Sequence, residues 1–342
     1  MLRGLGLVVL AAVVVACASD DGADVAAPGS TEPAPPAAEP GPEPPDTEAE
    51  PNDTFDTRGD EDVDDELVIV DIADFTVDLT ALGSMPVANV VGPEFLAGTI
   101  DVFDLTEEQQ AAILSAENVA PAFVLNVERV VELDPDLILT SEANEAFWAD
   151  PLEQLGGAFD VTVIGEDLTW QERSRTMARF VGAEDLMEER IVSAETALVD
   201  TAARVEEMGL AGTEVSVLWA FEPALSAMVE GSLAATVLDA VGLTQPAAQR
   251  TRQPPSSIEP EYAAAAPIAG ENLGDHDADA LVILNTADVA ADEWPAGYAR
   301  ELLPVLEEGP VIVTAYFGWT LNTATGVLAI NRDINRLLDE FE

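Results

Sequence analysis

Few side chains of this sequence could carry out covalent or metal chemistry. The 342 residues contain one cysteine, Cys17, and one histidine, His276. A single histidine argues against a His-rich zinc or manganese site, which draws on several imidazole and carboxylate ligands. The sequence shows no nucleophile elbow and no phosphate loop, and its carboxylates are too abundant to single out a catalytic pair. We therefore expect a protein that binds without catalysing, with no metal or cofactor of its own.

Aromatic and arginine side chains are the better candidates, because many of them follow short apolar runs. Ligands of open α/β sheets bind beyond the carboxyl ends of the strands, and clefts between lobes are common sites. Arginine pairs with anionic oxygens, so arginines in such loops suit an anionic ligand. Core packing is the alternative for each aromatic, and a solvated loop or a salt bridge between lobes for the arginines. The candidate ligand-binding residues are Phe75, Phe95, Trp148, Trp219, Phe221, Arg250, Arg252, Tyr262, Tyr316 and Trp319, with Tyr316 and Trp319 foremost.

The elements that must position these residues read as an α/β chain in two halves. Apolar runs of four to six branched residues with few charges suit strands that are buried on both faces, as in parallel sheets covered by helices. The expected strands are 67–72, 87–91, 122–125, 137–140 and 161–164 in the first half, and 215–219, 227–229, 281–285 and 311–315 in the second.

A long helical pattern separates the two halves. Residues 170–181 read as one helix, Gly182 interrupts the pattern, and residues 184–208 read as a second helix that stops at Gly209. Apolar residues of the second helix recur at alternating spacings of four and three, which places them on one face. A helix of this length spans about 37 Å. We expect it to be a strut that connects two lobes.

Each half also contains the same local pattern. Glu128 is followed by Asp134 and Asp136 and then by an apolar run, and Glu271 is followed at the same spacings by Asp277 and Asp279. Each segment reads as a short helix, a tight turn and a buried strand. The pattern predicts a pseudo-twofold relation between the two lobes.

The N-terminus reads as a secretion signal with a lipid attachment site. Arg3 precedes an uncharged stretch up to Ala16 that is shorter than the ~20 residues needed to span a bilayer. Residues 14–17, VVAC, resemble the lipobox of bacterial lipoproteins. The resemblance implies that residues 1–16 are removed and that Cys17 carries the lipid. A plain secretion signal that happens to contain a cysteine is the alternative.

Residues 17–66 would then form a lipidated cysteine and an acidic, proline-rich tether, because the segment has too few large apolar residues to fold. A flexible chain of this length has a root-mean-square reach of about 40 Å. The whole chain has 66 acidic residues against 13 basic ones, a formal net charge of −53. This charge argues against nucleic acid and anionic lipid as direct partners. A saline habitat or a biased genome would each produce it.

Four segments from residue 67 onward resemble the substrate-binding lipoproteins of ABC importers for ferric siderophores, haem or cobalamin. Residues 126–139, NVERVVELDPDLIL, are similar to that family's NLExIxxLxPDLI segment, the most specific of the four. Residues 78–87, DLTALGSMPV, are similar to its first helix, which ends in LGxxPVG. Residues 238–243 and 270–274 match landmarks of its second lobe.

The resemblance implies an α/β fold of two Rossmann-like lobes with parallel-type sheets, joined by a long rigid helix, with the ligand cleft between the lobes. The lobes would comprise residues 67–168 and 210–342, and the connecting helices residues 169–209. The implied ligand is an iron chelate, a ferric siderophore, with haem or cobalamin as alternatives. In this family one glutamate on each lobe docks onto arginines of the membrane permease, and Glu128 and Glu271 occupy the matching positions.

We accordingly expect an extracytoplasmic monomer, anchored by lipid to the outer face of the cell membrane, that passes its ligand to an ABC permease. For Glu128 and Glu271 the alternative is that they are ordinary acids of a very acidic surface. A surface lipoprotein of the same fold that serves adhesion or assembly is the alternative for the whole chain.

Overall fold

Two five-stranded sheets form the framework of the computed structural model, which describes residues 67–96, 100–221, 224–250, 265–285 and 300–342. The side chains of residues 94, 95, 221, 224 and 300 are not described. The expected signal peptide, Cys17 and tether lie outside these ranges. No helix of the described residues is both long enough and apolar enough to cross a bilayer.

The first sheet has the strand order β3-β2-β1-β4-β5, and all of its strands are parallel. Burial explains why β1 is mostly apolar: all four of its residues are buried, as expected for a central strand covered on both faces. Its strands are β1 (Ile69–Ile72), β2 (Ala88–Asn89), β3 (Glu117–Asn118), β4 (Leu137–Ser141) and β5 (Val161–Ile164).

The second sheet has the order β10-β9-β6-β7-β8. Strands β6, β9 and β10 are parallel, whereas β7 is antiparallel to both of its neighbours. The sheet is therefore mixed: β7 alone runs opposite to the other four strands, which agree with the parallel-type sheet predicted from the sequence. Its strands are β6 (Val215–Phe221), β7 (Ala224–Met228), β8 (Ala265–Pro267), β9 (Ala280–Asn285) and β10 (Val311–Ala315).

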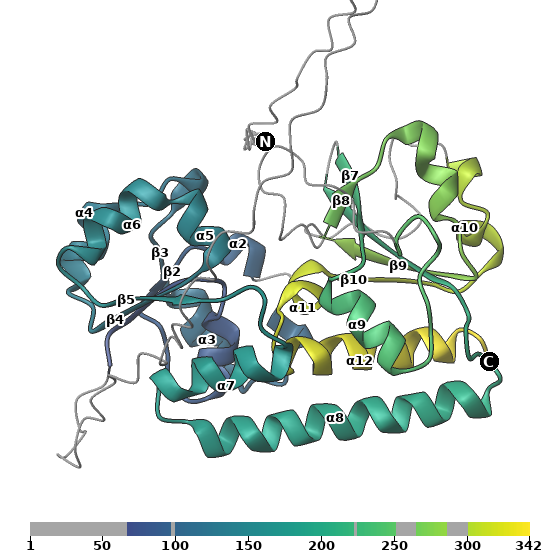
Figure 1. The fold of residues 1–342 in the computed structure, drawn as a ribbon, viewed down its shortest axis with the longest axis horizontal. Helices are drawn as coiled ribbons and strands as arrows, with labels where there is room; N and C mark the ends of the chain where they lie inside the picture. The colour runs from purple at the N-terminus through teal and green to yellow at the C-terminus, as the bar shows by residue number, and fades with distance from the viewer. Residues whose placement is uncertain (1–66, 97–99, 222–223, 251–264, 286–299) are drawn as a thin grey trace, which may run out of the picture. The chain divides into compact units, whose positions relative to one another are not determined.

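Helices cover both sheets (Figure 1). Those of the first lobe are α1 (Thr76–Ala81), α2 (Pro93–Leu96), η1 (Ile100–Val102), α3 (Glu107–Ser115), η2 (Pro121–Phe123), α4 (Val127–Leu133), α5 (Glu142–Phe147) and α6 (Ala149–Gly156). Those of the second lobe are α9 (Leu233–Ala240), η3 (Gly270–His276), η4 (Arg300–Leu302), α10 (Val305–Glu308), α11 (Tyr316–Thr320) and α12 (Ala324–Asp339).

Two consecutive helices connect the lobes, as the sequence predicted. Helix α7 (Trp170–Phe180) begins with a capping box formed by Thr169 and Glu172. Gly182 follows with a φ of 64°, a left-handed conformation that glycine adopts at little cost. Helix α8 (Glu184–Glu207) then runs for 24 residues beside α7 and α12 (Figure 1). Its buried residues include Met187, Ile191, Ala194, Thr201 and Val205, all from the predicted apolar face.

The pseudo-twofold pattern in the sequence corresponds to an equivalent geometry in the two sheets. Asp136, just before β4, accepts a hydrogen bond at 3.0 Å from the backbone N–H of Val68, just before β1. Asp279, just before β9, accepts one at 3.0 Å from the backbone N–H of Glu214, just before β6. Strands β4 and β9 pair in parallel with β1 and β6, so each aspartate joins two neighbouring strands at their amino ends. The strand order β3-β2-β1-β4-β5 of the first sheet therefore corresponds, position by position, to the order β8-β7-β6-β9-β10 of the second.

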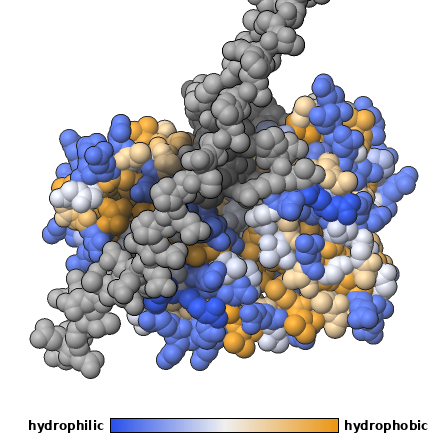
Figure 2. Space-filling model, viewed as in Figure 1, coloured by the Kyte–Doolittle hydropathy of each residue, from blue (hydrophilic) through white to orange (hydrophobic). Residues whose placement is uncertain are grey.

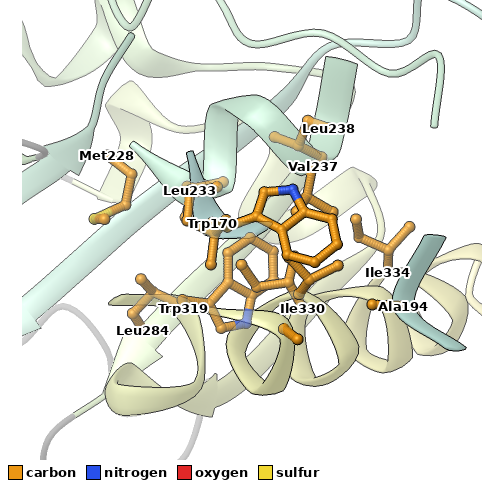
Figure 3. Close-up of a cluster of buried hydrophobic side chains, with 14 of the residues drawn as sticks. Trp170, Ala194, Met228, Leu233, Val237, Leu238, Leu284, Trp319, Ile330 and Ile334 are labelled. Carbon is orange, nitrogen blue, oxygen red and sulfur yellow. The ribbon is translucent and has the colours of Figure 1, made fainter. Parts of the chain in front are cut away.

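One hydrophobic cluster extends through both lobes and the helices between them. It includes Ile69 and Leu79 from the first lobe, Met187 and Ile191 from α8, and Trp319 from the second lobe. Figure 3 shows part of this cluster, where Trp319 and Ile330 lie among side chains of α9, β9 and α12 together with Trp170 of α7 and Ala194 of α8. The two lobes are therefore joined by continuous apolar packing as well as by the chain.

Several strand predictions differ from the structure. Residues 122–125 are not a strand: they include the end of η2, where Ala122 and Phe123 have φ values of 54° and 62°. The nearby strand is β3, which lies before Pro121 and lacks the apolar run that marks a buried strand. The predicted strand 87–91 shrinks to the two residues of β2. Strand β8 was missed because Ala-Ala-Pro carries no strand signal.

Candidate functional site

Helix α11 of the second lobe packs directly against the first lobe. Phe317 of α11 and Leu321, which directly follows this helix, join a hydrophobic cluster with Val77, Ile100 and Phe103 of the first lobe. A Cβ atom placed on Gly318 would lie 3.3 Å from the side chain of Val102. The start of α11 therefore lies next to the first lobe, which brings the carboxyl end of β10 near the carboxyl end of β1.

A buried polar contact reinforces this junction. The hydroxyl group of Thr323, the N-cap of α12, donates to both carboxylate oxygens of Asp78 in α1, at 2.9 and 3.0 Å. Asp78 and Thr323 are both 0% exposed. Burial raises the pKa of Asp78, while its hydrogen bonds with Thr325 and Thr323 lower it. Ser174 of α7 completes the joint by accepting from the backbone N–H of Ala324 at 2.9 Å.

Asp74 occupies the turn that follows β1. Its φ of 63° is a left-handed conformation, which aspartate tolerates better than most residues with a side chain. The side chain is partly exposed. Burial raises the pKa of Asp74 to about 6, with a lowering contribution from Arg173 and a further raising one from Glu166. Such strained, polar turns beyond a strand end are frequent at binding sites.

Arg173 lies beside this turn but is already engaged. One of its terminal nitrogens contacts Glu166 at 2.9 Å and donates to the carbonyl of Gly165 at 3.0 Å, and the other contacts Glu166 at 3.2 Å. Its guanidinium also lies 5.0 Å from the ring centroid of Phe75. Arg173 is 5% exposed, so it holds the loop after β5 and the start of α1 together rather than facing solvent.

The second lobe contributes a pair of stacked aromatic rings. Trp219 of β6 and Tyr316, the first residue of α11, stack with centroids 4.2 Å apart at an angle of 20°. Both side chains are partly buried. Burial raises the pKa of the Tyr316 hydroxyl, and the negative charge of Asp74 across the junction raises it further. Tyr316 and Asp74, from opposite lobes, are thus close enough to interact electrostatically.

These residues define the candidate site: Asp74 from the first lobe, and Trp219 with Tyr316 from the second. Asp74 follows β1, Tyr316 follows β10 and Trp219 lies in the carboxyl half of β6, near the edges where ligands of such sheets bind. An aromatic face beside a carboxylate can hold a flat or apolar group and a polar or cationic one next to it.

Three other aromatic candidates lie in the core. Trp319, a leading candidate from the sequence, is 0% exposed and donates its indole N–H to Asp333 at 2.9 Å, so its prediction as a ligand contact is wrong. Phe75 is 2% exposed and lies beneath Arg173. Trp148 is 8% exposed and donates to the carbonyl of Phe123 at 3.2 Å. For all three, core packing is what the structure shows.

Arg250 is exposed but does not lie at the candidate site. It pairs at 3.2 Å with Glu214, which directly precedes β6, at the amino end of the strand. The candidate site is at the opposite, carboxyl end of the sheet. The side chains of Phe95 and Phe221, and the whole of Arg252 and Tyr262, lie outside the described part of the chain.

Two buried acids near this edge were not predicted. Asp71, in β1, is 0% exposed and accepts from the Thr76 hydroxyl at 2.6 Å and from the Ala73 backbone at 2.9 Å. Burial raises its pKa to about 7, opposed by the hydrogen bond from Thr76. Asp78 is the other. An aspartate inside an apolar run such as Ile69–Ile72 was the available signal for Asp71, whereas Asp78 has the spacing of an ordinary helix residue.

Glu128 and Glu271 are both exposed, in the first turns of α4 and η3. Glu128 lines a surface depression of about 470 Å³ together with Val124, Leu125 and Pro151. Beside it, Phe123 and Val124 are 55% and 68% exposed. Figure 2 shows that hydrophilic residues cover much of the visible surface of the described lobes, with separate hydrophobic patches between them.

Metal-binding groups are lacking in the part of the chain that the structure describes: no three His, Cys, Asp or Glu side chains there are grouped to hold an ion. His276 is 7% exposed and its Nδ1 lies 3.3 Å from the side-chain nitrogen of Gln249. Burial lowers its pKa, which keeps the ring neutral. It is a hydrogen-bonded core residue of the second lobe.

The sequence matches no protein-family model and no curated protein. Solved structures of siderophore-binding proteins nevertheless share this fold over about 80% of the chain. This confirms, at the level of the fold, the resemblance seen in the sequence.

Three of these structures show the extent of the similarity. The Fe3+–Desferal-bound siderophore-binding protein FhuD from Vibrio cholerae has a TM-score of 0.62 at 16% identity and covers 80% of this chain and 98% of its own. SirA from Staphylococcus aureus, complexed with staphyloferrin B, has 0.59 at 15%, covering 81% and 95%. The siderophore periplasmic binding protein from the fuscachelin gene cluster of Thermobifida fusca has 0.59 at 18%, covering 81% and 97%.

Proposed function

We propose that this protein is a receptor that captures an iron chelate, a ferric siderophore, between its two lobes. The observation that carries the proposal is the stacked pair of Trp219 and Tyr316 at the carboxyl edge of the second sheet, where α11 packs against the first lobe and the charge of Asp74 acts on Tyr316. The fold supports it, because structures with the same fold were solved with ferrioxamine B, Desferal and staphyloferrin B bound. Binding needs no chemistry on the ligand and no resident cofactor.

Tryptophan fluorescence of the purified protein tests the proposal, since Trp219 lies at the candidate site. The protein is titrated with a ferric hydroxamate, a ferric catecholate, ferric citrate, haem and cobalamin. Saturable quenching by a ferric chelate at sub-micromolar concentration supports the receptor function and selects the ligand class. Quenching by haem or cobalamin alone would redirect the assignment to those ligands. No quenching by any of these compounds would favour a surface lipoprotein that serves adhesion or assembly and transports no ligand.

We further propose that the loaded protein delivers its ligand to an ABC permease through Glu128 and Glu271. Both side chains are exposed, one on each lobe, and each lies in the first turn of the helix that precedes Asp136 or Asp279 of the sequence repeat, which supports this role. One charge on each lobe would let arginines of the permease hold both lobes at once. Lipid attachment at Cys17 and a tether of residues 18–66 would keep a monomer at the outer face of the cell membrane, within reach of the permease.

A double variant separates delivery from capture. Glu128→Ala with Glu271→Ala should leave the affinity for the chelate unchanged, because neither side chain lies at the candidate site, and should stop uptake by cells. The matched control is Glu153→Ala with Glu301→Ala, which removes two other exposed acids, one from each lobe. Normal uptake by the Glu128 and Glu271 variant would contradict the docking role.

A further inference from the structure

Among the residues that the structure describes, the candidate site keeps one negative charge that no basic group neutralises. The basic group beside Asp74 is Arg173, and both of its terminal nitrogens contact Glu166. Arg173 and Glu166 therefore neutralise each other, and the carboxylate of Asp74 remains as an additional charge. Tyr316 adds none, because its raised pKa keeps the hydroxyl protonated.

The aromatic pair favours the same sign of ligand charge. The faces of Trp and Tyr rings carry negative electrostatic potential and attract cations placed over them. Trp219 and Tyr316 are stacked at 4.2 Å. Tyr316 begins α11, whose next residue, Phe317, packs against Val77 just after the turn of Asp74, and the charge of Asp74 raises the pKa of Tyr316. A cationic group that entered here would meet a carboxylate and an aromatic edge or face together, whereas an anionic group would meet repulsion from Asp74.

The position of Arg250, which the sequence predicted as a contact for anionic ligands, also favours a cationic ligand. Arg250 lies at the amino end of β6 and pairs with Glu214, so its positive charge does not act at the candidate site. The other candidate, Arg252, lies outside the described residues. Among the described residues at the site, the charge that remains is that of Asp74.

We propose that this site selects iron chelates that carry a positively charged group, and that Asp74 is the residue that recognises this charge. The inference rests on the proposed receptor function and narrows its ligand to cationic chelates. It reverses the expectation of an anionic ligand. A charge-assisted hydrogen bond between an ammonium group and a carboxylate is among the stronger polar contacts in proteins, so one residue can set the preference.

Two forms of one chelate test the proposal. Ferrioxamine B carries a free ammonium group, and its N-acetyl derivative has the same iron centre without that charge. Fluorescence titration should show that the protein binds ferrioxamine B about tenfold more tightly than the acetylated form, which corresponds to about 1.4 kcal/mol. In Asp74→Asn the ratio should fall below about twofold. Asparagine also tolerates a positive φ, so the turn is kept.

A charge control and a pH series sharpen the test. Glu153→Gln removes one exposed carboxylate from α6 and should leave the tenfold ratio unchanged. Among the described residues, the charged and titratable groups that act on Asp74 are Arg173, Glu166 and the buried Asp71 of β1 and, across the junction, Tyr316. Because the pKa of Asp74 is raised to about 6, the ratio in the wild-type protein should be full at pH 8 and largely lost at pH 5.

The outcomes separate the inference from the function on which it rests. Equal affinity for the two forms, or tighter binding of ferric citrate, would overturn charge selection and leave the receptor function standing. A tenfold ratio that persists in Asp74→Asn would overturn the role of Asp74. Binding of neither form, and of no other ferric chelate, would overturn the receptor function and this inference with it.

Discussion

At the scale of single residues, the unexpected feature is a carboxyl group enclosed in the first lobe. Asp71 is fully buried and has a pKa of about 7 instead of its usual 3.8. A raised pKa means that the folded protein keeps a proton that the unfolded chain releases. The stabilising contribution is complete below pH 3.8 and is lost as the pH rises through 7.

We predict that Asp71→Asn removes this pH dependence. Asparagine is nearly the same size and can keep hydrogen bonds to Thr76 and Ala73. Between pH 4 and pH 8 the free energy of unfolding of the variant should rise relative to the wild type by up to about 4 kcal/mol, since one pKa unit corresponds to about 1.4 kcal/mol. Urea denaturation at the two pH values measures this difference. A difference that is the same at both would show that Asp71 ionises normally in the folded state.

Trp319 and Tyr316 should respond to substitution in opposite ways. Trp319→Ala opens a cavity in the core and should cost about 3–5 kcal/mol of unfolding free energy. Tyr316→Ala removes a partly exposed ring, so it should cost no more than about 2 kcal/mol, mostly the loss of stacking and packing. It should weaken chelate binding at least tenfold. Unchanged affinity in Tyr316→Ala would remove Tyr316 from the binding site.

The sequence could not distinguish these two residues. Both follow the last apolar run within four positions, and both are aromatic residues at a strand end, which was the signal used. What separates them is the direction of α11, which turns Trp319 toward Asp333 and Tyr316 toward Trp219. That direction depends on contacts with the first lobe, far away in the sequence. For the same reason, Asp74 was not among the candidates from the sequence.

At the scale of elements, periodicity predicted the connecting helices and the longer strands closely and the shortest strands poorly. Helix α8 begins at Glu184 as expected, because a 24-residue amphipathic pattern between two glycines is a strong local signal. Central strands β1, β4 and β9 were also found, since both of their faces are buried. Edge strands β3 and β8 have two and three residues, too few to show a period.

The junction between α1 and α12 should be worth more than an ordinary helix cap. Thr323→Ala removes both the N-cap of α12 and the hydroxyl that donates to buried Asp78. Ser232→Ala removes only the N-cap of α9 and is the matched control. A cap is worth about 1 kcal/mol, and a buried acceptor that loses its donor adds about 1–3 kcal/mol. Chemical denaturation should therefore show a larger loss for Thr323→Ala; equal losses would mean that the contact with Asp78 contributes no stability.

At the scale of the whole described fold, the two lobes share one core. The cluster that contains Ile69 and Trp319 passes through α7 and α8 without interruption. Smaller clusters, such as the one around Val130 and Leu155, belong to one lobe. Continuous packing of this kind makes separate unfolding of either lobe costly, and it limits how far the lobes can move apart around a ligand.

We predict that the lobes unfold in a single transition. Val130→Ala lies in the first lobe alone and Leu281→Ala in the second, and each should cost about 2–4 kcal/mol. Each substitution should lower the denaturation midpoint equally, whether the transition is followed by tryptophan fluorescence or by far-ultraviolet circular dichroism. Two separated transitions, of which a substitution shifts only one, would show that the shared core does not couple the lobes.

The position of α11 has a consequence for the order in which the protein can assemble. Val77, Ile100, Phe103 and Ile113 of the first lobe are closed over by Leu321 and Ala329, which are synthesised about two hundred residues later. A ribosome that has completed the first lobe therefore holds a nascent chain whose apolar cluster is still open. Until residues 316–329 have been synthesised, the first lobe exposes apolar side chains that chaperones can bind. The first lobe can therefore finish folding only when synthesis of the chain is nearly complete.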